Sequence, residues 1–177
     1  MHFEKIFGSA QGAIYRPIPE DGFHLIGFTG QATNIYPSAP VITLREDNED
    51  KERPLLRPPI RFASTGTPIG AGQPLVQTWL PIAPPGYVPL GMAAAPFDEG
   101  EPPVETLRCL RLDQATPVRL FAGWISDFGD FIHWIEGTNT LWYINFRVPL
   151  FDEDHMPSLE PVYAPKALAN GSTESAA

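Results

Sequence analysis

A phrase built from an aromatic residue, prolines and glycines occurs twice in this chain, at residues 15–27 and 79–91. Both copies keep these residues at one constant offset. The aligned pairs are Tyr15 with Trp79, Pro17 with Pro81, Gly22 with Gly86, Phe23 with Tyr87, and Gly27 with Gly91. An internal repeat decides the architecture before any single motif does, so we expect a fold assembled from equivalent units.

The duplication continues beyond this phrase in the same order. Residues 40–45 match 103–108, and residues 59–62 match 117–120. A shortened third unit is also expected, in which 132–135 take the place of 77–80 and 144–147 take the place of 42–45, around a compact turn at 136–140. The sequence therefore predicts a single domain over residues 1–151, with units at about 1–58, 59–116 and 117–151.

Proline decides the kind of element that these units contain, because 21 of the 177 residues are proline. Proline breaks helices and cannot donate a hydrogen bond within a central strand, so short strands joined by rigid turns are expected. In the repeated phrase, Pro85 precedes Gly86, which is free to adopt positive φ, and Tyr87 then re-enters a sheet.

The predicted fold class is all-β and β-prism-like, with three pseudo-repeated antiparallel sheets around a shared core. In this arrangement Tyr15, Trp79 and Trp134 would occupy equivalent positions. A two-sheet β-sandwich is the alternative, followed by a β-trefoil. The polar, proline-containing tail at 152–177 is predicted to be extended and largely disordered.

The net charge of −9 argues against a nucleic-acid partner, which requires a basic face. No stretch is long and apolar enough for a transmembrane helix, and no signal-peptide pattern opens the chain. A single cysteine, Cys109, allows no intramolecular disulfide. The simplest expectation is a cytoplasmic protein, with secretion by a non-classical route as the alternative.

The densest group of polar residues lies in the odd third unit, at residues 126–136. Asp127, Asp130 and His133 could form an acid–base centre if a hairpin brought them together, although Asp-rich turns are also ordinary turn chemistry. Trp124, Asn139 and Arg147 are the candidate ligand-binding residues of this unit. No cofactor motif or metal-ligand spacing occurs, so neither a cofactor nor a metal is expected.

The second copy of the phrase, at 79–91, together with residues 107–111, resembles the signature of the vacuolar protein sorting sixty-two-related family. The pattern is also similar to multivesicular-body-subunit-associated β-prism domains. Leu80 and Met92 depart from the family pattern, which usually has an arginine and an acidic residue at these positions. The resemblance implies an all-β fold and a binding role near membranes or trafficking machinery, and it implies no catalytic residues.

These observations predict a non-enzymatic binding module that recognises a protein or a membrane lipid head group. One alternative is a lectin-like or pore-former accessory protein that binds carbohydrate through exposed tryptophans. The other alternative is an enzyme centred on Asp127, Asp130 and His133. The sequence does not specify an oligomeric state.

Overall fold

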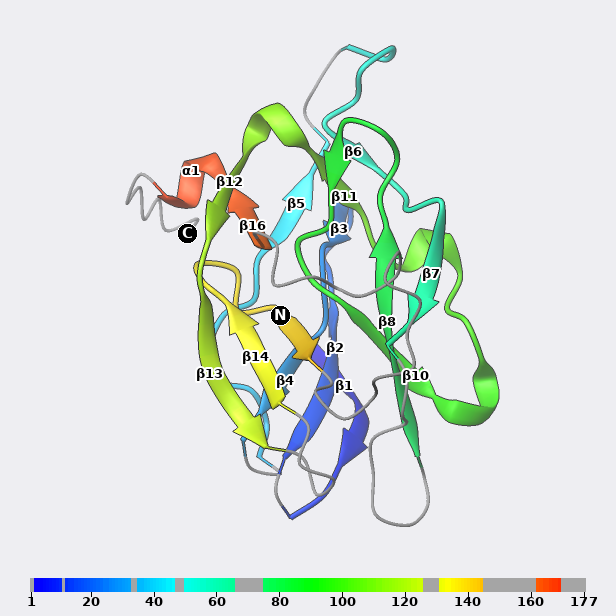
Figure 1. Cartoon of the computed structure of the whole chain (residues 1–177), viewed down its shortest axis with the longest axis vertical. Coiled ribbons are helices and arrows are strands. Elements are labelled where there is room, and N and C mark those ends of the chain that lie inside the picture. Colours follow the sequence, from blue (N-terminus) through cyan, green and yellow to red (C-terminus); the bar gives the residue numbers. More distant parts are fainter. Residues whose placement is uncertain are drawn as a thin grey trace.

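The computed structural model describes residues 2–10, 12–32, 35–46, 50–65, 75–125, 131–144 and 162–169. These residues form short β-strands, three single-turn 3-10 helices and one helical turn, α1 (Lys166–Ala169) (Figure 1). The prediction of an all-β fold made of small antiparallel sheets is confirmed. No helix in these ranges is long and apolar enough to cross a membrane.

Three antiparallel sheets share one design, in which the second strand along the chain lies in the middle. The first sheet contains β1 (His2–Gly8), β2 (Ala13–Ile18) and β4 (Thr29–Gln31). The second contains β7 (Arg61–Ser64), β8 (Val76–Ile82) and β10 (Ala93–Pro96). The third contains β13 (Leu120–Ile125), β14 (Phe131–Ile135) and β15 (Leu141–Ile144).

The three sheets are joined by a closed ring of backbone hydrogen bonds. The Phe28 amide donates to the Met92 carbonyl (2.8 Å), the Met92 amide to the Leu141 carbonyl (3.1 Å), and the Leu141 amide to the Phe28 carbonyl (2.7 Å). Each sheet contributes one donor and one acceptor, so the arrangement of the sheets is cyclic. The more specific β-prism arrangement stays a prediction.

The residues that precede the three ring members are Gly27, Gly91 and Thr140, and they pack against one another at very short distances. A Cβ atom placed on Gly27 would lie 2.8 Å from the Cα atom of Gly91 and 2.8 Å from the Cβ atom of Thr140. Thr140 therefore fills the centre from the third unit, and its hydroxyl donates to the Leu90 carbonyl at 2.5 Å. Glycine is needed in the other two units because the backbones approach so closely.

The sequence predicts that Trp134 is equivalent to Tyr15 and Trp79. Counted from the ring, the equivalent residue of the third sheet is one position earlier. Tyr15 pairs with Thr29, and Trp79 pairs with Ala93, each partner lying one residue after a ring member. In the third sheet the corresponding partner is Trp142, and it pairs with His133. His133 thus takes the place of Tyr15 and Trp79, whereas Trp134 donates its indole N–H to the Gly30 carbonyl (3.0 Å).

Shorter strands form additional sheets. β3 (Phe23–Leu25) pairs with β5 (Thr43–Arg45), and β11 (Cys109–Arg111) lies between β6 (Leu56–Arg57) and β9 (Tyr87–Val88). Phe23 pairs with Arg45, and Tyr87 pairs with Arg111. Arg45 therefore corresponds to Arg111, and not to Arg108 as the matching of 40–45 with 103–108 predicts.

Part of the expected disordered tail belongs to the core. β16 (Val162–Pro165) pairs with β12 (Ala115–Val118), and the side chains of Val162 and Ala164 are buried. Residues 145–161 and 170–177 lie outside the described residues. The extent of the domain and its three units stays a prediction.

One apolar core cluster unites the sheets. It draws buried side chains from every unit, including Ile14, Phe28, Val76, Met92, Ile135 and Leu141. Because removing this apolar surface from water is the main favourable term in folding, the three sheets stabilise one another.

Candidate functional site

The two copies of the repeated phrase make the same turn. Gly22 and Gly86 have φ values of 82° and 81°, and the amides that follow them donate back to the carbonyls of Glu20 and Pro84, each at 3.0 Å. A positive φ at the third turn position is typical of a type II turn and favours glycine there. The phrase is thus explained by backbone geometry.

Arginines and aromatic residues brace the sheets beside these turns. The Arg45 guanidinium lies 5.5 Å from the centre of the Phe23 ring, and the Arg57 guanidinium lies 5.3 Å from that of Tyr87. The Tyr87 hydroxyl also donates to the Pro54 carbonyl at 2.6 Å. These contacts occupy the aromatic faces and tie neighbouring loops to the sheets.

The expected acid–base centre is only partly covered by the structure. His133 lies on β14, is partly buried, and pairs with Trp142. Asp127 and Asp130 lie outside the described residues, so an enzyme centred on these three residues stays a prediction. Among the residues that the structure describes, no group of three or more His, Cys, Asp or Glu side chains could hold a metal ion.

The candidate ligand-binding residues of the third unit are not gathered at one place in the described backbone. Trp124 pairs with Ile132 near one end of β14, whereas Asn139 lies in the turn beyond its other end. The side-chain amide of Asn139 donates to the Pro40 carbonyl at 2.7 Å, and the backbone carbonyl of Asn139 accepts from the Thr29 hydroxyl at 2.9 Å. Asn139 therefore joins the third unit to the first, and Arg147 lies outside the described residues.

Burial shifts the pKa values of two other side chains, Cys109 and His24. Burial raises the pKa of the Cys109 thiol to about 12, so the thiolate needed for nucleophilic attack is scarce. His24, on β3, has its pKa lowered by burial and then by the nearby Arg108 guanidinium, with Glu46 opposing the shift. Burial is the largest cause of both shifts.

A cavity of about 420 Å³ opens between the first and second sheets. Its walls come from β1 and β2 on one side, from β10 on the other, and from residues 96–106, which contain the 3-10 helices η1 (Phe97–Glu99) and η2 (Val104–Thr106). The lining includes Ile6, Phe28, Pro96, Pro102 and Pro103. Its volume lies within the range of about 300–1,000 Å³ that is typical of ligand pockets.

A second hollow of about 260 Å³ lies beside this cavity, next to strand β2 of the first sheet. Arg16 and Thr106 line both spaces, and Pro17, Ile18, Pro19 and Leu25 line the second space alone. We call the two spaces together the inter-sheet groove. Proline-rich walls make it stiff, because each proline ring restricts its own backbone φ.

Segment 96–106 is held in place from both sides. The Glu101 carboxylate accepts from the Phe62 amide at 2.7 Å, which anchors the segment to β7. The Thr106 amide donates to the Pro103 carbonyl at 2.9 Å, and the Arg108 amide donates to the Leu25 carbonyl of the first unit at 2.8 Å. The groove is therefore already formed in the protein without a bound partner.

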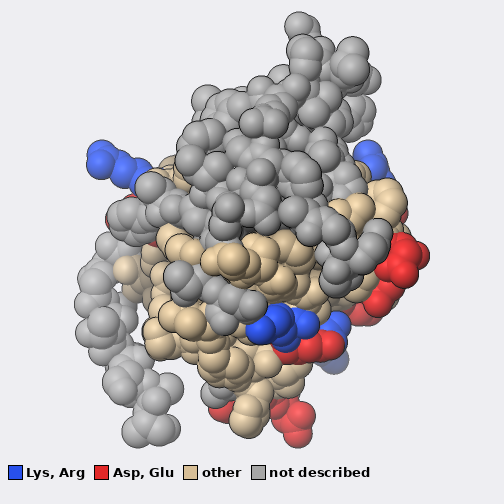
Figure 2. Space-filling model, turned by 90° about the horizontal axis from the view of Figure 1, so that it is seen from below, with Lys and Arg blue, Asp and Glu red and all other residues tan. Residues whose placement is uncertain are grey.

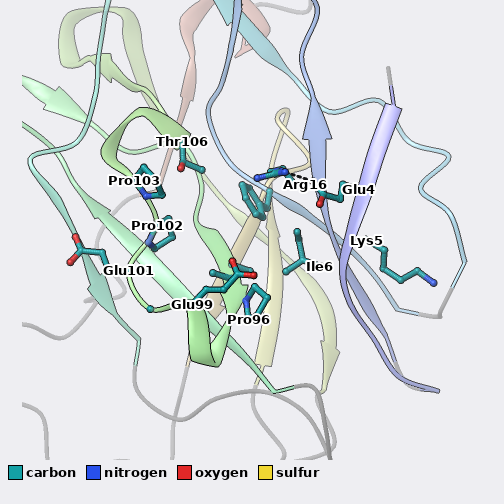
Figure 3. Close-up of a pocket in the computed structure, with 14 residues that line it drawn as sticks. Glu4, Lys5, Ile6, Arg16, Pro96, Glu99, Glu101, Pro102, Pro103 and Thr106 are labelled. Carbon is teal, nitrogen blue, oxygen red and sulfur yellow. Dashed lines mark hydrogen bonds and ion pairs between the residues drawn. The ribbon is translucent and has the colours of Figure 1, made fainter.

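Charged side chains border the groove. Arg16 is paired with Glu4, and the Lys5 side chain points away from the cavity, with its ammonium 5.8 Å from the centre of the Tyr15 ring (Figure 3). The Glu99 carboxylate points toward the middle of the cavity, between Pro96 and Ile6. Seen from below, the described part of the molecule is mainly uncharged, with acidic side chains at the right and lower edges and acidic and basic side chains side by side near the centre (Figure 2).

The sequence did not point to this groove. Its residues come from the first unit and from β10 and segment 96–106 of the second unit, and none belongs to the third unit, where functional residues were expected. The one local signal is the acidic, proline-rich stretch between β10 and β11, which contains Glu99, Glu101, Pro102 and Pro103.

The cyclic sheets and the preformed groove define a β-rich module. A family model described as vacuolar protein sorting-associated protein 62 matches residues 4–125, more than half of the chain, so the chain belongs to this family. The resemblance expected from the sequence is confirmed.

The fold also occurs in a solved structure. The crystal structure of GNIP1Aa from Chromobacterium piscinae is similar to this chain with a TM-score of 0.65 and 17% sequence identity. The match covers 85% of this chain and 32% of GNIP1Aa, so the chain spans about a third of that protein. At this identity the similarity shows a shared fold alone. No curated protein sequence matches the chain.

Proposed function

We propose that this chain is a non-enzymatic binding module that recognises a protein partner by holding an extended segment of it in the inter-sheet groove. The observation that carries the proposal is that two neighbouring hollows have Arg16 and Thr106 in common in their linings. Two neighbouring, stiff and partly apolar hollows suit a chain segment, because a preorganised site loses little conformational entropy when it binds.

A protein segment fits this groove better than an anionic lipid head group does. The chain carries a net charge of −9, and the groove arginine, Arg16, is already paired with Glu4. A phosphate in the groove would approach the Glu99 and Glu101 carboxylates, which repel it. A role in membrane trafficking, in keeping with the family name, and a cytoplasmic location form part of the same proposal.

The test is to fill the junction of the two hollows with a large side chain. Thr106→Trp should weaken the binding of peptides from a random-sequence array about tenfold or more, which corresponds to about 1.4 kcal/mol. Thr116→Trp is the matched control, because Thr116 lies on β12, outside the groove. Calorimetric titration of both folded variants would measure the dissociation constants.

Either of two results would overturn the proposal. One is the absence of peptide binding by the unmodified chain, and the other is equal peptide binding by the two tryptophan variants. Binding to vesicles that contain anionic phospholipid, with no binding to peptides, would favour the lipid head group instead.

A further inference from the structure

We infer that the inter-sheet groove selects segments carrying a lysine or arginine, whose cationic group meets the Glu99 carboxylate. This inference rests on the proposed function and adds the chemistry of the partner. It is drawn from the charged side chains of the groove that remain available to a bound peptide, and from the proline residues that surround them.

Most of the groove's charged side chains are already engaged within the protein. Arg16 and Glu4 form an ion pair, and Glu101 accepts a hydrogen bond from the Phe62 amide. Lys5 is turned away from the cavity (Figure 3). Glu99 is exposed, and it makes no hydrogen bond or ion pair within the described part of the chain. The charge left for a guest is therefore negative.

The walls beside Glu99 suit the aliphatic part of a basic side chain. Pro96 adjoins η1, and Pro102 and Pro103 follow Glu101 on the same segment. Lysine and arginine place their methylene groups along apolar surface and keep the charged end in a polar environment. A guest lying against these prolines could therefore place its cation at the Glu99 carboxylate.

The same arrangement disfavours an acidic or phosphorylated segment. The Glu101 carboxylate lines the cavity together with that of Glu99, and Arg16 is already paired with Glu4. An anion on the guest would lie near two carboxylates without a cation of its own, and such like-charge contacts give specificity against the wrong partner.

The experiment uses the full chain and arrays of short peptides that differ at the central position, which is arginine, glutamine or glutamate. The flanking positions are randomised among uncharged residues. We expect arginine-centred peptides to bind most tightly and glutamate-centred peptides most weakly. Glu99→Gln should weaken the arginine-centred peptides by about threefold to fivefold, as expected for an ion pair near the surface.

Asp98→Asn is the matched control, because Asp98 is the exposed neighbour of Glu99 and does not line the groove. This variant should keep the wild-type preference. Equal binding of arginine- and glutamine-centred peptides, or equal effects of Glu99→Gln and Asp98→Asn, would overturn the inference while the peptide-binding function stands. Absence of binding to every peptide would overturn the function itself.

Discussion

Three residues beside the ring of hydrogen bonds, at what we call the central axis, show how one side chain can affect the packing of all three sheets. Gly27, Gly91 and Thr140 meet there, and only the third unit supplies a Cβ atom. A Cβ atom on Gly91 would lie 2.8 Å from the Gly27 Cα atom, a contact with backbone that cannot be relieved by rotating a side chain. The axis therefore has room for about one side chain.

Gly91→Ala should lower the free energy of unfolding by about 1–3 kcal/mol, the usual cost of overfilling a well-packed site. Thr140→Gly should also destabilise, because it removes the hydrogen bond to the Leu90 carbonyl. Combined, the two changes should cost less than the sum of their separate effects, since the second removes one of the clashes that the first creates. Urea unfolding of the three variants measures this coupling, and strict additivity would contradict the account of the axis.

At the scale of elements, the strand β16 shows how part of a tail expected to be extended and largely disordered packs into the core. Val162 and Ala164 have exposed fractions of 5% and 1%. They pair with Val118 and Thr116 of β12, a strand whose described neighbour is β16 alone. Without β16, the backbone groups of β12 that pair with it would need water or another partner.

Val162→Ala should lower the free energy of unfolding by about 1–2 kcal/mol, because it removes two buried methyl-sized groups at about 0.8 kcal/mol each. The exposed Lys166 on α1 offers the control substitution Lys166→Ala, which should leave stability nearly unchanged. Thermal unfolding followed by circular dichroism would compare the two. Equal stability of Val162→Ala and the unmodified chain would show that β16 is not part of the core in solution.

Local chemistry explains which elements could be predicted from the sequence. The turns at Gly22 and Gly86 follow from the need for positive φ, and the strands follow from prolines that exclude helices. The one-residue shift that places His133 opposite Trp142 could not be predicted, because it depends on the ring of hydrogen bonds between distant units. The strand β16 was missed because its partner, β12, is remote in sequence.

The groove could not be predicted for the same reason. Thr106 and Arg16 lie in different units, and only the cyclic arrangement of the sheets brings them to one surface. Functional residues were expected in the third unit because this unit lacks the repeated Pro-Gly phrase and contains a compact turn at 136–140 instead. In the structure, Asn139 of that unit is used to bind the backbone at Pro40.

At the scale of the whole molecule, the three sheets form a scaffold in which two of them border the binding surface. The third sheet closes the ring through Leu141 and adds Ile135 to the shared core. The GNIP1Aa match shows that this fold also occurs within a longer chain, since the match covers about a third of that structure. The central claim is that partners bind between the first and second sheets.

The most direct test is a nuclear magnetic resonance titration of the isotope-labelled chain with the tightest arginine-centred peptide from the array. The account predicts that the largest changes in amide chemical shift occur around the groove, at Ile6, Arg16, Ala95, Glu99 and Thr106. Largest changes at the turn 136–140 or at α1, with those groove amides unmoved, would contradict it.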